Sequence, residues 1–169
     1  MKPKRLLQIT IILVVTIVTI NFFNTASTRA AVDTGDESDG PLTVSAADTV
    51  VNSYTYLTGN ETLSTTIITV NDASSFSAGD EVLIIQMQES SGDAGQYEFA
   101  DIDSKSGNDI TLTSGLTNDY YSGTFDSQNA NSTQIIRVPQ YTSVTVDSGA
   151  SITSSAWDGY SGGIVVFRA

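Results

Sequence analysis

The chain has 169 residues, with 19 acidic and 7 cationic residues, no histidine and no cysteine. Its first thirty residues hold four of the cations and no acid, so the remainder carries 3 cationic against 19 acidic residues, a formal charge of −16. A body this acidic is repelled by phosphate backbones, which excludes nucleic acid as a partner. The missing residue types exclude Ser-His and Cys-His catalysis, the usual zinc sites and disulfides.

The first thirty residues have the three parts of a secretory signal peptide. A basic start at residues 1–5 precedes an apolar run from Leu6 to Phe23, and Thr28 and Ala30 supply small residues at positions −3 and −1 of a cleavage site. The sequence predicts a signal helix cleaved near Ala30 and a secreted, extracellular or cell-surface protein that meets the membrane only through this segment. The alternative is a retained anchor, because about 18 apolar residues approach the ~20 that span a bilayer.

The next stretch, residues 31–49, is polar and acidic. It contains no aromatic residue, and a Gly40-Pro41 pair interrupts it. Low hydrophobicity and high charge favour a solvated chain, so we expect an acidic flexible leader here and a β-rich domain over residues 50–169.

The remaining residues form short alternating or apolar runs separated by Gly, Asn, Asp and Ser. No window keeps the apolar spacing of a helix over three turns, so the pattern predicts an all-β domain. The expected strands are Val50–Leu57, Thr62–Val70, Glu81–Gln88, Tyr97–Asp103, Asp109–Thr113, Gln134–Val138, Ser143–Val146, Ala150–Thr153 and Gly163–Arg168.

Two local patterns predict how these strands are arranged. A Gly79-Asp80 turn precedes the run Glu81–Gln88, which is too apolar for an edge and predicts a central strand of a small β-barrel or sandwich, with Phe76 closing the barrel end. Residues 104–109 contain Gly107 and Asn108, which tolerate positive φ, so a hairpin is expected between the strands on either side.

The order of several segments resembles a module found near the N-terminus of large secreted or surface-exposed, adhesin-like bacterial proteins. The resembling segments are 76–88, 95–100, 107–112, 134–141, 144–150 and 157–168. The resemblance implies a small β-domain that leads into the first rungs of a right-handed parallel β-helix or another repetitive stalk. It carries over no catalytic residue.

The last strand, Gly163–Arg168, is apolar and would leave an exposed edge. The sequence therefore predicts either a fragment of a longer protein, truncated at its C-terminal end, or self-association through this strand.

Three residues are candidates for carbohydrate binding: Trp157, Asp158 and Tyr160. Aromatic faces stack on sugar rings and a carboxylate accepts hydrogen bonds from hydroxyl groups. The competing interpretation is that Trp157 is packed and that Asp158-Gly159 forms a tight turn.

Acidic residues near the predicted hairpin suggest two further chemistries. Asp101, Asp103 and Asp109 could hold calcium weakly at the surface, although Lys105 occupies the place where an EF-hand would have a ligand. Glu98, with Asp101 and Asp103, could supply the carboxylates of a glycosidase or lyase. The alternative for both is a solvated strand face, and no other cofactor is expected.

Together these observations predict a structural or adhesion module without catalytic activity, at the base of a longer surface protein that contacts surface polysaccharide. The alternative is a carbohydrate-binding accessory module of a secreted polysaccharide-degrading enzyme.

Overall fold

The computed structural model describes residues 34–90, 92–123 and 131–169. These ranges contain ten strands and no helix, so the all-β prediction is confirmed. None of the described segments is a helix long and apolar enough to cross a membrane. The predicted signal peptide and its cleavage site lie outside the described residues.

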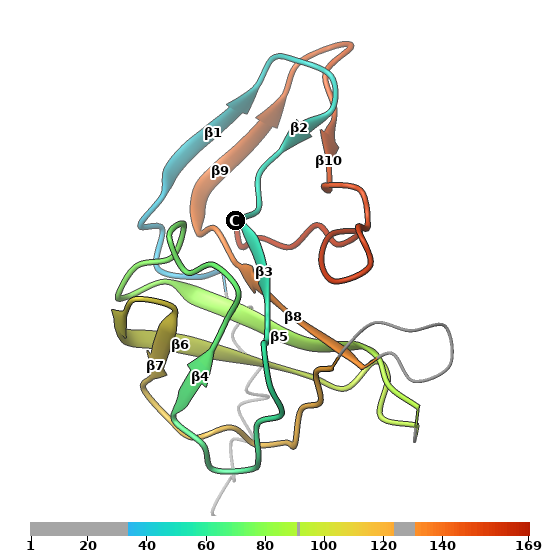
Figure 1. The fold of residues 1–169 in the computed structure, drawn as a ribbon. Coiled ribbons are helices and arrows are strands. Elements are labelled where there is room, and N and C mark those ends of the chain that lie inside the picture. The colour runs from blue at the N-terminus through green and yellow to red at the C-terminus, as the bar shows by residue number, and fades with distance from the viewer. Residues whose placement is uncertain (1–33, 91, 124–130) are drawn as a thin grey trace, which may run out of the picture. The chain divides into compact units, whose positions relative to one another are not determined.

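Six strands form one antiparallel sheet in the order β3-β8-β5-β6-β7-β4 (Figure 1). Their bounds are β3 (Tyr54–Tyr56), β4 (Ile67–Thr69), β5 (Glu81–Gln88), β6 (Tyr97–Ser106), β7 (Asp109–Leu112) and β8 (Ser132–Arg137). The two outer strands meet next to their ends, where Leu57 and Val70 form an antiparallel bridge. The sheet therefore curls back on itself as a small barrel.

β5 is the central strand that its apolar run predicts, with the expected bounds. It pairs with β8 on one side and β6 on the other, and Val82 and Ile84 point into the main core. Leu83 and Ile85 belong to a smaller cluster on the opposite face. Because side chains alternate along a strand, a continuous apolar run is buried on both faces only in such a central position.

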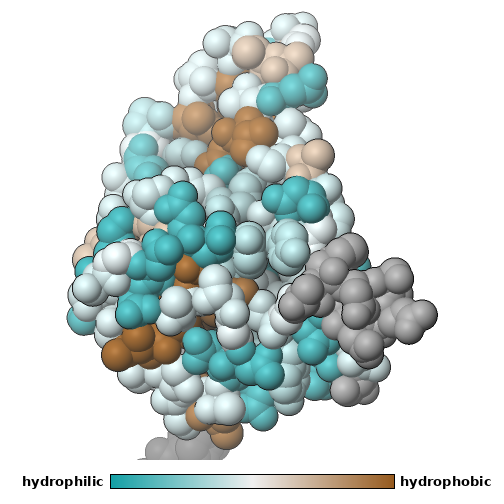
Figure 2. Space-filling view, in the orientation of Figure 1, coloured by the Kyte–Doolittle hydropathy of each residue, from teal (hydrophilic) through white to brown (hydrophobic). Residues whose placement is uncertain are grey.

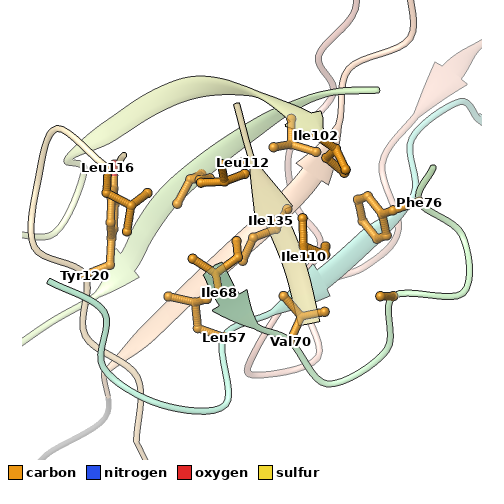
Figure 3. Close-up of a cluster of buried hydrophobic side chains, with 13 residues drawn as sticks. Leu57, Ile68, Val70, Phe76, Ile102, Ile110, Leu112, Leu116, Tyr120 and Ile135 are labelled. Carbon is orange, nitrogen blue, oxygen red and sulfur yellow. The ribbon is translucent and has the colours of Figure 1, made fainter. Parts of the chain in front are cut away.

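The main core fills the curled side of the sheet (Figure 3). Ile68 of β4, Ile110 of β7 and Ile135 of β8 are completely buried there. Phe76, which the sequence predicted to close one end of the barrel, is also completely buried in this cluster. Side chains from distant parts of the chain thus converge on one core.

The expected hairpin joins β6 to β7. Ser106 pairs with Asp109, which leaves Gly107 and Asn108 as a two-residue loop. Gly107 has φ +63°, a conformation that glycine adopts without steric cost. Asn108 is not among the residues with positive φ; its side-chain amide donates to Asn71 O (2.9 Å) instead.

Two parallel pairs adjoin the barrel. β1 (Gly40–Val44) pairs with β9 (Tyr141–Val146), and β2 (Thr49–Val50) pairs with β10 (Ile152–Thr153). The structure differs here from the expected leader, because residues 40–44 and 49–50 are strands of the folded unit. The acidic stretch offers few apolar residues as a signal, but Val44 is buried once β9, about a hundred residues later in the chain, lies beside it.

The C-terminal segment runs over the outer face of the sheet. Ile164 and Val166 pack on the cluster that contains Leu83 and Ile136. Among the described residues, the predicted strand Gly163–Arg168 forms one backbone bridge, the parallel one between Arg168 and Gln140. In place of a neighbouring strand, the side chain of Asn52 accepts a hydrogen bond from Val166 N (3.2 Å) and donates to Val166 O (2.6 Å).

Two buried glutamines attach loops to the sheet in the same way. The Gln134 amide forms a reciprocal pair with the backbone N and O of Gly162, at 2.9 and 3.2 Å. The Gln86 amide bonds both backbone groups of Tyr121, at 2.7 Å each, and also Gln88 O and Thr133 Oγ1. Side-chain amides therefore satisfy loop backbone groups that would otherwise be buried without partners.

Candidate functional site

The loop that carries the predicted carbohydrate-binding residues is tied to the fold. The Asp158 carboxylate accepts from the backbone N of Tyr160 and of Ser161 at 2.8 Å each, which makes a tight turn. The Tyr160 ring stacks on Tyr56, with centroids 4.7 Å apart. Trp157 is 36% exposed. Of the three predicted residues, Trp157 therefore has the most accessible ring, while Asp158 bonds its own loop and Tyr160 packs against a neighbouring ring.

A close approach of backbones holds this loop in place. Gly162 has φ +104°, and a Cβ atom there would lie 2.5 Å from Ala156 O. Gly159 has nearly the same φ, +103°, with no atom near its Cβ position. Gly162 is thus required for both its conformation and its lack of a side chain, whereas Gly159 is required for conformation alone.

The three acids predicted for calcium lie at separate places around the hairpin. The Asp109 carboxylate accepts from Thr69 Oγ1 at 2.8 Å. Asp103 lies at a register shift in β6, between Ile102 and Ser104, so the regular alternation that would align it with Asp101 is broken there. Asp101 lines a cleft described below. The described residues contain no group of three or more Asp, Glu, His or Cys able to hold a metal ion.

Glu98 and Asp101, two of the three carboxylates considered for glycosidase or lyase chemistry, do not form a pair. Glu98 and Asp101 lie three residues apart in the regular part of β6, so they face opposite sides of the strand. Glu98 is also bonded by Thr117, through its backbone N (2.9 Å) and its hydroxyl (2.9 Å). Two carboxylates on opposite faces cannot flank one glycosidic bond.

A cleft of about 470 Å³ lies where the N-terminal and C-terminal segments meet the barrel. Its polar lining combines Asp36, Glu81 and Asp101 with Arg168 and Gln140. Gly35 closes one side, and a Cβ there would lie 2.5 Å from Gln140 Oε1. Backbone and polar side chains therefore shape this cleft, with more acidic than cationic groups.

Two arginines organise the charges around the cleft. Arg168 Nε donates to Glu81 Oε2 at 2.6 Å, and its Nη2 reaches Oε1 of the same carboxylate. Arg137 bonds Asp80 and Asp39 at 2.7 Å each. Burial lowers the pKa of Arg137, but the hydrogen bonds and charges of the two aspartates outweigh burial and leave it raised. These pairs connect β5, β8 and the N- and C-terminal segments.

Two exposed aromatic rings adjoin the cleft. Tyr97 is 58% and Phe99 43% exposed, and their centroids are 6.1 Å apart in an edge-to-face arrangement. The Arg168 guanidinium lies 5.1 Å from the centre of the Phe99 ring. The sequence contains a signal for this surface, because Tyr97, Phe99 and Asp101 alternate along one predicted strand and therefore share a face.

Other exposed apolar residues of the described ranges are dispersed. Figure 2 shows hydrophobic residues as separate patches among hydrophilic ones on the face in view, one of them in the region of β9 and β2. The large exposed apolar side chains besides the β6 pair are Val50, Leu63, Ile67, Val146, Trp157, Val165 and Phe167.

Comparison with known proteins gave structural likenesses only. The chain matches no protein-family model and no curated protein. The tailspike of Acinetobacter baumannii bacteriophage AP22, solved in complex with capsular saccharide, is 18% identical with a TM-score of 0.39, over 64% of this chain and 21% of the tailspike. The tailspike of Pseudomonas phage phi297 is 14% identical (TM-score 0.38; 67% and 21%), and that of Pseudomonas phage LKA1 is 16% identical (TM-score 0.37; 63% and 22%). The chain thus spans about a fifth of the length of these tailspike chains.

Proposed function

We propose that this chain is a structural module of a secreted or cell-surface protein, in which the barrel forms a base and further parallel strands stack on β9 and β10. The observation that carries the proposal is the sequence of parallel pairings: β1 with β9, β2 with β10, and Arg168 with Gln140. Parallel strands stacked by successive turns of one chain are the arrangement of a solenoid.

The backbone groups of β9 alternate between two neighbours. Asp147 N donates to Val44 O, so the backbone groups of Val146 point away from β1. On that outer side, Tyr141 N donates to Arg168 O at 2.9 Å, and Arg168 N donates to Pro139 O at 2.9 Å. A strand that runs on from Arg168 would therefore lie along the outer edge of β9, parallel to it.

The β2–β10 pair repeats this arrangement. Thr49 N donates to Ser151 O, which leaves the backbone groups of Ile152 on the far edge. β9 and β10 follow each other in the chain as β1 and β2 do, so the outer edge of β9 and the far edge of β10 lie on the same side of the stack. They would accept the next turn of a solenoid together. The signal-like first thirty residues support export of such a module.

Two measurements test the proposal. The reading frame after codon 169 should continue with short strands punctuated by Gly, Asn and Asp, and an immediate stop codon would contradict a base for further strands. In the chain as it stands, the amides of Val144 and Val146 should exchange with solvent faster than that of Thr145, which faces β1. Equal protection of all three amides at low protein concentration would show that the outer edge is already occupied.

A further inference from the structure

The outer face of β6 carries an apolar surface that the rest of the fold leaves open. Tyr97 pairs across the sheet with Ile85, and Phe99 with Leu83, so both rings lie on the face where the smaller cluster packs. The C-terminal segment covers this face over β8 and β5 through Ile164 and Val166. Among the described residues it leaves the two rings of β6 about half exposed.

This aromatic pair continues directly into polar groups. Asp101 lies two residues beyond Phe99 on the same face of β6 and lines the cleft. Arg168 contacts Phe99 on one side and the cleft on the other. From Tyr97 to Asp101 the strand extends about 13 Å. Tyr97, Phe99 and Asp101 thus share one face of β6, and Asp101 joins this face to the cleft that Arg168 and Gln140 also line.

We propose that this surface, the β6 track of Tyr97, Phe99 and Asp101 with the adjoining cleft, binds a neutral polysaccharide chain. Aromatic rings offer flat apolar faces with negative charge density to the C–H groups of a sugar ring. In the cleft, the Asp101 carboxylate can accept hydrogen bonds from hydroxyl groups, because the Glu81 carboxylate is bonded by Arg168 and the Gln140 amide oxygen accepts from Asp36 N. Binding sites of this kind combine apolar walls with a few fixed polar groups.

Charge selects the ligand class. Asp36, Glu81 and Asp101 outnumber Arg168 in the cleft, and Arg168 is already paired with Glu81. The body of the chain carries −16. An acidic polysaccharide would be repelled by these charges, as would a second copy of this chain. A chain of uncharged sugars is not repelled by these acidic groups.

The β6 track differs from the sequence-based site in the Trp157 loop. Asp158 in that loop bonds its own backbone, while Asp101 of the track lines an open cleft. Tyr160 has a ring stacked on Tyr56, while Tyr97 is 58% exposed. Substitution therefore distinguishes the two surfaces. Binding at the β6 track is weakened by Tyr97→Ala and not by Trp157→Ala, whereas binding at the Trp157 loop is weakened by Trp157→Ala and not by Tyr97→Ala.

Affinity electrophoresis of the whole chain tests the proposal. Xylan, galactomannan and a mixed-linkage β-glucan serve as neutral probes in the gel, and alginate serves as the acidic probe. We expect the wild type to be retarded by at least one neutral probe and not by alginate. Tyr97→Ala should weaken that retardation about tenfold, since the loss of one aromatic contact is of this order. Asp101→Asn, which keeps the side-chain shape, should weaken it severalfold.

Trp157→Ala is the matched control, because it removes an exposed ring outside the β6 track and should leave the retardation unchanged. Far-UV circular dichroism verifies the fold of each variant. Retardation by no neutral probe, stronger retardation by alginate, or dependence on Trp157 and not on Tyr97 would each overturn the proposal. None of these outcomes bears on the stacking of strands on β9, which the exchange of Val144 and Val146 tests independently.

Discussion

The Arg168–Glu81 pair offers the sharpest test of how the C-terminal segment is held. Glu81 begins the central strand and is only 8% exposed. Both of its carboxylate oxygens are bonded by Arg168, and Gln140 Nε2 also donates to Oε2 at 3.3 Å. In Arg168→Met this carboxylate would lose its cation while remaining in place in the fold.

The expected cost follows from burial. Removing one partner of a fully buried ion pair costs about 3–5 kcal/mol, because the other charge is left uncompensated. The side chains here keep 18% and 10% exposure, so we expect Arg168→Met to lower the free energy of unfolding by about 3 kcal/mol. Adding Glu81→Gln removes the orphaned charge, and the double variant should recover about half of that loss.

Urea denaturation followed by far-UV circular dichroism measures these values. Lys105→Met is the matched control, because it also removes one cation from the acidic body. Its ammonium group donates to Ala73 O (2.8 Å) and forms none of the described salt bridges, so the loss should stay below about 1 kcal/mol. If Arg168→Met is no more destabilising than this control, or if Glu81→Gln brings no recovery, the buried pair is not what holds the segment.

Three further outcomes follow from the geometry. Gln86→Met should lower the free energy of unfolding by about 2–4 kcal/mol, since it leaves several buried backbone groups unpaired. Gln96→Met, which loses one exposed hydrogen bond, should lower it by less than about 1 kcal/mol, and urea denaturation midpoints compare the two variants. Gly162→Ala should lower the melting temperature more than Gly159→Ala, because both have the same φ and only the first meets Ala156 O; equal shifts would contradict the clash. Burial raises the pKa of the Glu61 carboxyl above its ordinary 4.5, so the folded chain holds this proton more tightly than the unfolded chain does, and the wild type loses stability as the pH rises from 4.5 through the raised pKa. Glu61→Gln cannot titrate, so its stability relative to the wild type should increase over that pH interval. A difference in urea midpoint that stays constant with pH would refute the assignment.

The sequence predicted those strands whose signal is local. β5 has the expected bounds because its apolar run is continuous and a Gly79-Asp80 turn precedes it. β6 and β7 were found because they flank a short loop with Gly107. In each case, neighbours in the chain are also neighbours in the sheet.

What the sequence did not reveal depends on distant partners. β1 lies in an acidic stretch and becomes a strand because β9 lies beside it. The segment 163–168 has the composition of a strand, but the Asn52 side chain bonds Val166 where a strand would, so no ladder forms. Gln86 is polar in the sequence and completely buried in the fold, where two of its hydrogen bonds go to the backbone of Tyr121, thirty-five residues away.

The same dependence applies to the candidate sites. For Asp158 the sequence left two interpretations open, a contact to a ligand and a tight turn, and its carboxylate bonds the backbone of that turn. Tyr97 and Phe99 looked like ordinary strand residues, and only the path of the C-terminal segment shows that β6 is left uncovered.

The position of Arg168 has a mechanical consequence. Its backbone is bonded to the edge of β9, while its guanidinium grips the first residue of β5. In a surface protein under tension, a pull on a strand continuing from Arg168 would be shared between the hydrogen bonds to the edge of β9 and the ion pair to the central strand β5. Such a load would reach the central strand directly, without passing through the hairpin between β6 and β7.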